Sequence, residues 1–283
     1  MRNIIVPLDF SADSLKGLEL ALLIAKHSAV KIQLVYVQKK TDIPSVSEEE
    51  YRSAEKNLKK IIDNYTGVLP KESQLTYIIK KGKVYQEIVS QAQAYPESII
   101  VASTHGASGF EELFIGSNAY RVVCATTKPV ITIRQQPVPQ KIKKIVLPID
   151  ISIESRQKVI FTGMLAEIFG AEIHVLVVTQ SKSKKVISRL NAYSAQVCNY
   201  LKSKNIKYKT ASLIDKAPIT SIIDYIEKEK ADMVSIINES GESITDLIIG
   251  GEAQQMISKS TVPVLTIRAK PHTIKESFST FGG

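Results

Sequence analysis

The chain is poor in the residue types that build disulfide frameworks and metal centres. Its 283 residues include two cysteines, Cys124 and Cys198, and four histidines. The cysteines lie far apart with no paired spacing, which excludes a disulfide scaffold and indicates a reducing, cytoplasmic compartment. The histidines are scattered without the spacing of metal ligands, so we expect no metal site built from protein side chains.

Long apolar runs and compositionally biased tracts are also lacking. The first apolar run, Ile4–Leu8, is cut by Asp9 and is too short for a signal peptide or a membrane span. With 44% hydrophobic and 23% charged residues, the composition is that of a soluble globular protein. We therefore expect no membrane partner.

Positive charge is in excess, with a formal net charge of +9 and lysines concentrated at residues 182–185 and 202–209. These clusters fall where a predicted helix and the strand after it present a solvated face, and Tyr208 is the one aromatic residue close to them. Basic clusters alone are weak evidence of a nucleic-acid groove, so we expect no nucleic-acid partner. Lysine-driven nucleic-acid binding stays open as an alternative, which affinity falling steeply with salt would reveal.

What the chain does contain is an internal duplication. Residues 2–9 (RNIIVPLD) return 141 positions later as KKIVLPID, and residues 127–134 (TKPVITIR) return as TVPVLTIR at the end of the second copy. The repeats predict two domains, residues 1–136 and 142–268, each long enough to bury its own core. The proline-containing stretch between them is the expected linker, and residues 269–283 form a C-terminal tail without a strong pattern.

Each repeat alternates strand and helix patterns in the order βαβαβαβαβ. Apolar runs typical of buried strands open the repeats at residues 3–8 and 144–149, and the longest helical patterns, both polar, cover residues 47–65 and 182–203. Strands that alternate with helices predict the α/β class, with a parallel, doubly wound, five-stranded sheet in each domain. Helices would cover both faces through right-handed crossovers.

The two repeats differ in the loop after the fourth predicted strand. The first repeat carries Gly106 and then Gly116, which precedes Ser117 and Asn118 at a predicted helix start. Glycines let backbone N–H groups approach a polyphosphate, and the N-terminus of a helix favours an anion. Ligands of doubly wound sheets lie beyond the carboxyl ends of the strands, so this loop and the one with Asp9 are the candidate binding site.

Each of these residues also has a purely structural interpretation. Ser117 can be an N-cap, Gly106 a turn residue, and Asp9 a cap of the first helix. Asp150 keeps the place of Asp9 in the repeat that lacks the glycine loop, which favours a partly structural role for this aspartate.

Three segments resemble the universal stress protein family: Val6–Ser11, the spacing Gly106-x9-Gly116-Ser117, and the run Lys128–Ile131. The family signature reads G-x2-G-x9-G-[S/T], and Ser103 stands here where its first glycine belongs. The resemblance covers both repeats and implies a tandem two-domain member with an adenine nucleotide alpha hydrolase-like, Rossmann-like fold. It also implies a pseudo-dimer in which the final strands pair, an arrangement that covers apolar edge strands otherwise open to aggregation.

The same resemblance implies a ligand and its contacts. In ATP-binding members of the family, the aspartate after the first strand contacts the nucleoside, the end of the second strand meets the adenine, and the glycine signature holds the phosphates. The corresponding positions are Pro7, Asp9, Val37, Ser103, Gly106, Gly116, Ser117 and Asn118. We therefore expect an adenine nucleotide (ATP, ADP or AMP) in the first repeat, with Mg²⁺ accompanying ATP.

The second repeat has lost this signature. Ile237 and Ser240 occupy the places of its first two glycines, Gly251 replaces the serine, and Glu239 replaces His105. A carboxylate beside a phosphate site is unfavourable, so we expect no nucleotide in the second domain.

No nucleophile–base pair is visible, so the sequence predicts a cytoplasmic stress-response sensor or regulator rather than an enzyme. Its partners would be the nucleotide and an unidentified protein, and a homodimer is a further assembly open to it. One alternative is a nucleotide-free protein-interaction module, which Ser103 favours. The other is a slow ATP hydrolase or autophosphorylating protein, with Ser103, Thr104, Ser108 or Ser117 as acceptors.

Overall fold

The computed structural model of the chain describes residues 1–40, 43–104, 116–214, 217–238 and 251–269. The first half consists of β1 (Asn3–Pro7), α1 (Ala12–Ala25), β2 (Lys31–Gln38), α2 (Pro44–Thr66), β3 (Gln74–Lys81), α3 (Val84–Gln93), β4 (Ser98–Ser103), α4 (Ser117–Ala125) and β5 (Val130–Ile133). The second half consists of β6 (Lys144–Ile149), the 3-10 turn η1 (Glu154–Arg156), α5 (Val159–Phe169), β7 (Glu172–Thr179), α6 (Lys184–Ser203), β8 (Tyr208–Ile214), α7 (Pro218–Glu229), β9 (Met233–Asn238), α8 (Gly251–Lys259) and β10 (Val264–Arg268). The predicted alternation of strands and helices is confirmed in both halves.

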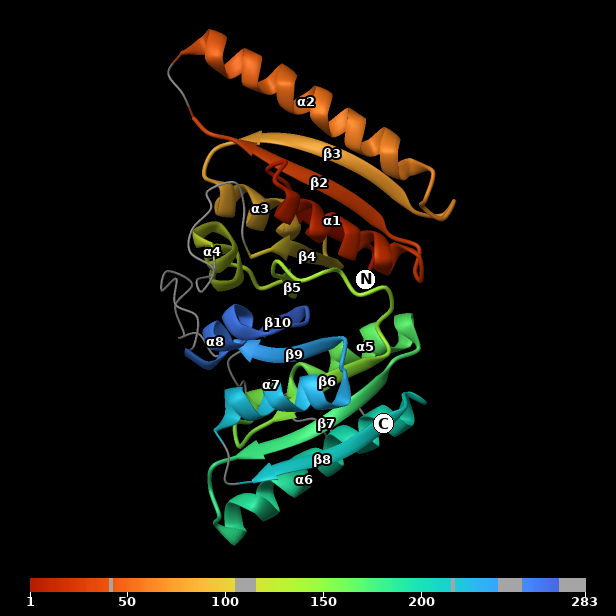
Figure 1. Cartoon of the computed structure of the whole chain (residues 1–283), viewed down its shortest axis with the longest axis vertical. Coiled ribbons are helices and arrows are strands. Elements are labelled where there is room, and N and C mark those ends of the chain that lie inside the picture. The colour runs from red at the N-terminus through yellow and green to blue at the C-terminus, as the bar shows by residue number, and fades with distance from the viewer. Residues whose placement is uncertain (41–42, 105–115, 215–216, 239–250, 270–283) are drawn as a thin grey trace.

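The strands form one ten-stranded sheet in the order β3-β2-β1-β4-β5-β10-β9-β6-β7-β8 (Figure 1). Within each half, neighbouring strands are parallel. Chain order reverses beside β1, which lies between β2 and β4, and again beside β6, which lies between β7 and β9. This is the doubly wound arrangement that the repeats predict, present twice.

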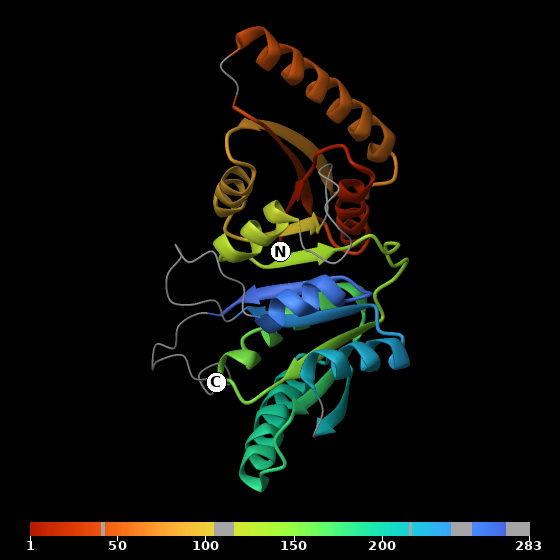
Figure 2. The same cartoon turned by 60° about the vertical axis from the view of Figure 1, so that its left-hand side comes forward.

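The two halves join through their final strands. β5 and β10 pair antiparallel, with Ile131 opposite Leu265, so the expected pseudo-dimer is confirmed within one chain. The pairing leaves β3 and β8, rather than the apolar final strands, at the two edges of the sheet. Figure 2 shows the same order from the side, with α2 beyond β3 at one end and α6 at the other.

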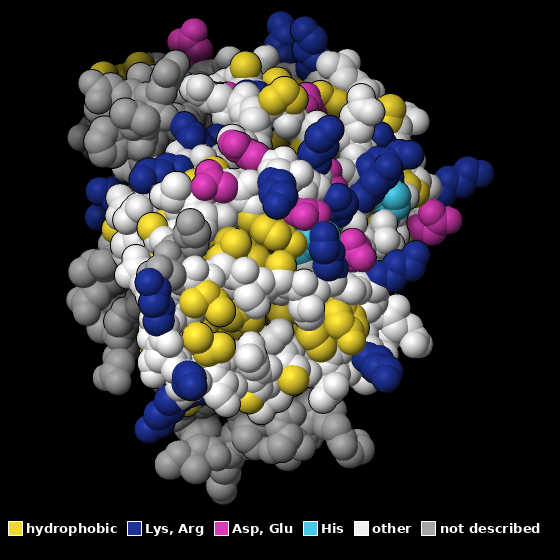
Figure 3. Space-filling view, turned by 60° about the horizontal axis from the view of Figure 1, so that its bottom comes forward, with side chains coloured by type: hydrophobic (Ala, Val, Ile, Leu, Met, Phe, Trp, Pro, Cys, Tyr) yellow, Lys and Arg dark blue, Asp and Glu magenta, His cyan; other side chains and the backbone are white. Residues whose placement is uncertain are grey.

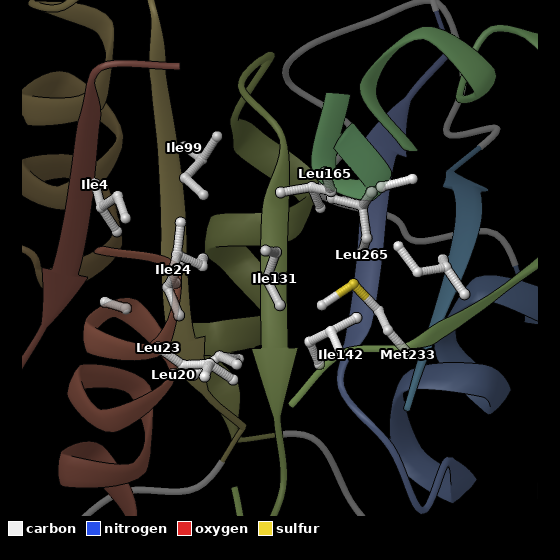
Figure 4. Packing of buried hydrophobic residues seen from close by; sticks show 14 of the residues in the cluster. Ile4, Leu20, Leu23, Ile24, Ile99, Ile131, Ile142, Leu165, Met233 and Leu265 are labelled. Carbon is white, nitrogen blue, oxygen red and sulfur yellow. The ribbon is translucent and has the colours of Figure 1, made fainter. Parts of the chain in front are cut away.

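Alternate strand residues pack into two cores on opposite faces of the sheet. On β1, Ile4 belongs to the core under α1, α2, α5 and α6, and Ile5 belongs to the core under α3, α4, α7 and α8. The first of these cores is continuous across the join. In Figure 4, Ile131 of β5 lies between Ile99 of the first half and Leu265 of the second, all three fully buried.

Two arginines also cross the join, one from each half. Arg134, just after β5, donates from Nη1 to the carbonyl oxygen of Ser258 near the end of α8. Arg268 of β10 donates from Nη1 to the carbonyl oxygen of Cys124 near the end of α4, at 2.9 Å. The carboxyl ends of these helices carry partial negative charge, so each guanidinium lies where a cation is stabilised.

The helices, the cysteines and the surface can each be compared with the expectations from composition. No helix in the described part of the chain is long and apolar enough to cross a membrane. Both cysteines are free thiols, and burial raises the pKa of Cys124 to about 11. On the face seen in Figure 3, Lys and Arg side chains are interspersed with acidic and apolar ones.

Candidate functional site

One cavity of the first half lies where the strand order reverses. It has a volume of about 530 Å³, within the range of small-molecule sites. Its walls come from the carboxyl ends of β1, β2 and β4 and from the first turns of α4, with α3 closing one side. Parallel strands end at the same edge, which is why segments distant in sequence meet here.

The structure brings most of the predicted site residues together at this cavity. Its lining includes Pro7, Asp9, Val37, Ser103, Gly116, Ser117 and Asn118. Gly106, the eighth predicted residue, lies outside the described residues, as do the second-repeat positions Glu239 and Ser240. The seven lining residues share one cavity, and their roles in binding stay predictions.

Asp9 organises the turn between β1 and α1. Its Oδ1 accepts hydrogen bonds from the Ser11 backbone N–H at 3.1 Å and from the Ser11 hydroxyl at 2.6 Å. Ser11 in turn is the N-cap of α1, its Oγ accepting from the Ser14 N–H at 3.1 Å. In the second half, Asp150 accepts from the Ser152 N–H at 2.7 Å. The aspartate therefore has a structural role in both repeats, as the duplication indicated.

Ser117 is not the N-cap of α4, contrary to its structural interpretation from the sequence. Gly116 is the N-cap residue, with no side-chain capping bond, and Ser117 is the first residue of the helix. The Gly116 N–H donates to the Thr104 carbonyl at 2.7 Å, which fixes the helix start against the end of β4. A helix start without a side-chain cap presents backbone N–H groups and positive dipole to the cavity it lines.

The sequence reasoning missed a group of residues at the β2 end of the cavity. Tyr36, Lys39 and Glu50 line it there, and the Tyr36 hydroxyl donates to Glu50 Oε1 at 2.8 Å. Burial, together with this bond to the carboxylate, raises the pKa of Tyr36 to about 12. Tyr36 could have been suspected as the neighbour of Val37. Glu50 belongs to a polar helix with no pattern that marks it.

Phe10 supports this wall from the turn after β1. Its ring stacks on Tyr36 with centroids 5.0 Å apart and planes inclined by 26°. The Phe10 backbone has φ of 65°, in the left-handed region that a bulky residue rarely adopts. Such a conformation costs on the order of 1 kcal/mol and persists where surrounding contacts hold it, here the ring stack beside the cavity.

The first part of α2, which carries Glu50, is held by polar contacts rather than by a core. Along the whole helix only Ala54 and Leu58 are buried. Near its start, the Gln38 side-chain amide donates to the Ser47 carbonyl at 2.5 Å, and Lys81 Nζ donates to the Ser47 hydroxyl at 2.9 Å. Together with the Tyr36–Glu50 bond, these contacts position one rim of the cavity.

The described residues of this site do not include a cluster of metal-ligating side chains. Among the residues whose positions the structure gives, no three His, Cys, Asp or Glu side chains gather as metal ligands. A cation accompanying a nucleotide would depend on phosphate oxygens for ligands.

A doubly wound sheet with a cavity at its switch point defines the class of doubly wound α/β proteins, whose ligands lie beyond the carboxyl ends of the strands. A model of the universal stress protein family matches residues 1–134 and again residues 141–268. The chain belongs to the universal stress protein family, with two family domains in tandem.

Individual relatives match one domain or both. The universal stress protein YxiE of Bacillus subtilis (strain 168) is 26% identical over 145 residues, which cover 47% of this chain and 98% of that protein. A universal stress protein from Archaeoglobus fulgidus DSM 4304 has the same two-domain fold, with a TM-score of 0.75 at 19% identity over 95% of this chain and 97% of its own. Another, from Archaeoglobus fulgidus in complex with dAMP, is 17% identical over 46% of this chain and 98% of its own, with a TM-score of 0.37.

Proposed function

We propose that the first domain binds an adenine nucleotide in the 530 Å³ cavity and that the protein is a nucleotide-dependent regulator of the stress response. The observation that carries the proposal is the convergence of the glycine-serine helix start and the Asp9 turn on one cavity at the switch point. The choice of adenine rests on family membership, together with the adenine nucleotide that the resemblance to ATP-binding members of the family implies.

The two ends of the cavity suit the two ends of a nucleotide. At the β2 end, Val37 offers backbone groups to a base, with the Tyr36 and Phe10 rings close by. At the opposite end, the first turn of α4 offers backbone N–H groups to phosphate oxygens. Ser103 is small enough to keep the phosphate path open where the family has glycine, and its hydroxyl can donate a hydrogen bond.

In this proposal the protein's own residues bind and orient the nucleotide. Asp9 and Pro7 would meet the nucleoside, and Gly116, Ser117 and Asn118 would hold the phosphates. Bound ATP would supply phosphate oxygens as ligands for Mg²⁺. The second domain would take no nucleotide, because Glu252 in the first turn of α8 already complements the helix dipole there and would repel a phosphate.

The test is calorimetric titration of the full chain with ATP, ADP and AMP, with matched variants in the two domains. Ser117→Glu places a carboxylate at the α4 start and should weaken binding by at least about tenfold. Gly251→Glu is its counterpart in the second domain, where an added side chain meets nothing within 4 Å, and should leave binding unchanged.

A second pair separates ligand contact from turn structure. Asp9→Ala and Asp150→Ala each remove a carboxylate that holds the turn after the first strand of its domain. Only Asp9→Ala should weaken nucleotide binding. Absence of binding to the intact protein, with thermal stability unmoved by nucleotide, would overturn the proposal in favour of the interaction module. Turnover of bound ATP to ADP, followed by chromatography, would instead favour the hydrolase.

A further inference from the structure

The second domain retains a cavity at the equivalent switch point. It has a volume of about 250 Å³ and is lined by the carboxyl ends of β6 and β9 together with α7 and the start of α8. Asp150 and Val178 line it in the places that Asp9 and Val37 have in the first domain. The duplication has therefore preserved a hollow, and the side chains around it have changed.

The changes make the second cavity smaller and place larger apolar side chains beside the helix start. Ile236, Ile237 and Met256 line it where the first cavity has Ala102, Ser103 and Val122. These longer side chains take up the space beside the helix start, and the volume falls from about 530 to about 250 Å³. The remaining space suits a compact molecule with an apolar body rather than a nucleotide.

The charges on the lining favour a cation. Asp150 and Glu252 contribute two carboxylates, and Lys158, 2% exposed, contributes one ammonium. Asp150 is half-buried and accepts one hydrogen bond from the described residues, from the Ser152 N–H at 2.7 Å. A carboxylate has about four acceptor positions, so Asp150 retains capacity for a donor that enters the cavity.

From this lining we infer that the second cavity binds a compact primary amine with an apolar body, the ammonium group donating to Asp150 and the body lying against Ile222, Ile236 and Met256. A carboxylate of the same shape would place a like charge beside Asp150 and would be rejected. The site is separate from the proposed nucleotide site, so either can fail without the other.

The methionines provide a direct test. The chain has four, and Met256 lines the second cavity, whereas the first cavity has no methionine among its lining residues. In the full chain with carbon-13 methionine methyl groups, titration with 2-phenylethylamine should shift the Met256 signal, assigned with Met256→Leu. Its acidic counterpart, 3-phenylpropionate, should leave that signal in place. A dissociation constant near about 1 mM is expected for so small a probe.

Asp150→Asn should weaken amine binding by about tenfold while the folded spectrum is retained, because a charge-assisted hydrogen bond is lost. The matched change Asp9→Asn in the first domain should have no effect on the Met256 shift. The inference is overturned if about 10 mM amine leaves Met256 unmoved. It is also overturned if the acid shifts the signal equally, or if Asp150→Asn binds the amine as tightly as the intact protein.

Discussion

At the scale of single residues, the two halves separate structural roles from binding roles. Asp9 and Asp150 make the same kind of turn contact to a following serine, and each lines the cavity of its own domain. An aspartate present in both copies is therefore explained by the turn, and a ligand contact is an additional use of its carboxylate. Tyr36 has no such duplicate, because Val177 occupies the corresponding place on β7.

Tyr36→Phe should lower the free energy of unfolding by about 1 kcal/mol, since it removes the hydrogen bond to the Glu50 carboxylate and leaves the stack on Phe10 intact. The pKa of Tyr36, raised to about 12, sets a pH dependence for this contribution. It is fully present below about pH 10 and is lost as pH rises toward 12, because the neutral phenol is the form that donates. Urea unfolding of both proteins at neutral pH measures the difference, and an unchanged midpoint would contradict it.

At the scale of elements, strand order and alternation could be predicted because apolar runs and helical periodicity are local signals. β6 was expected at residues 144–149 and is Lys144–Ile149. The site residues that could be predicted are those of the family motif, in the loops that follow the first and fourth strands. Glu50 and Lys39 were missed because their approach to the cavity depends on how α2 is tied to the edge of the sheet, through contacts such as Gln38 to Ser47.

The first helix begins earlier in the first half than in the second, and the position of Gly17 accounts for this difference. Gly17 of α1 lies against the end of β4, where an added Cβ would be 3.3 Å from the Val101 carbonyl oxygen and 3.4 Å from the Ser103 nitrogen. Lys158 stands at this position in the second repeat, and there the helix begins late, at Val159, after the turn η1. The glycine lets α1 start directly after Ser11 and pack closely on the strand that carries Ser103.

Gly17→Lys should therefore destabilise the protein by about 2 kcal/mol or more, because a long side chain cannot fit between α1 and the β4 backbone. Nucleotide affinity should fall as well, since the end of β4 lines the cavity. Gly67→Lys is the control, because a Cβ there meets nothing within 4 Å, and its effect should stay within about 0.5 kcal/mol. Equal unfolding midpoints for the two variants would show that α1 does not depend on this contact.

At the scale of the whole molecule, the join decides whether the chain behaves as two domains or as one body. The described part of the sheet is continuous through β5 and β10, yet the register between these strands comprises three residue pairs. Packing across them is provided by Ile131 and Leu265, both fully buried. The two arginines add a reciprocal contact, each from one half to a helix end of the other.

Arg268→Ala should lower the free energy of unfolding by about 1–2 kcal/mol, because it removes a charged donor from the Cys124 carbonyl at the end of α4. Arg134→Ala should have a similar effect through Ser258 and α8. The control is Arg2→Ala, whose side chain is 82% exposed and pairs with Glu97 at 3.3 Å, a surface ion pair expected to contribute less than about 1 kcal/mol. Urea unfolding followed by circular dichroism measures all three.

If the arginines stabilise the join specifically, Arg268→Ala should also broaden the transition, as the halves begin to unfold separately. A transition of unchanged midpoint and slope would mean that the paired strands and their apolar core hold the two halves together without the arginines.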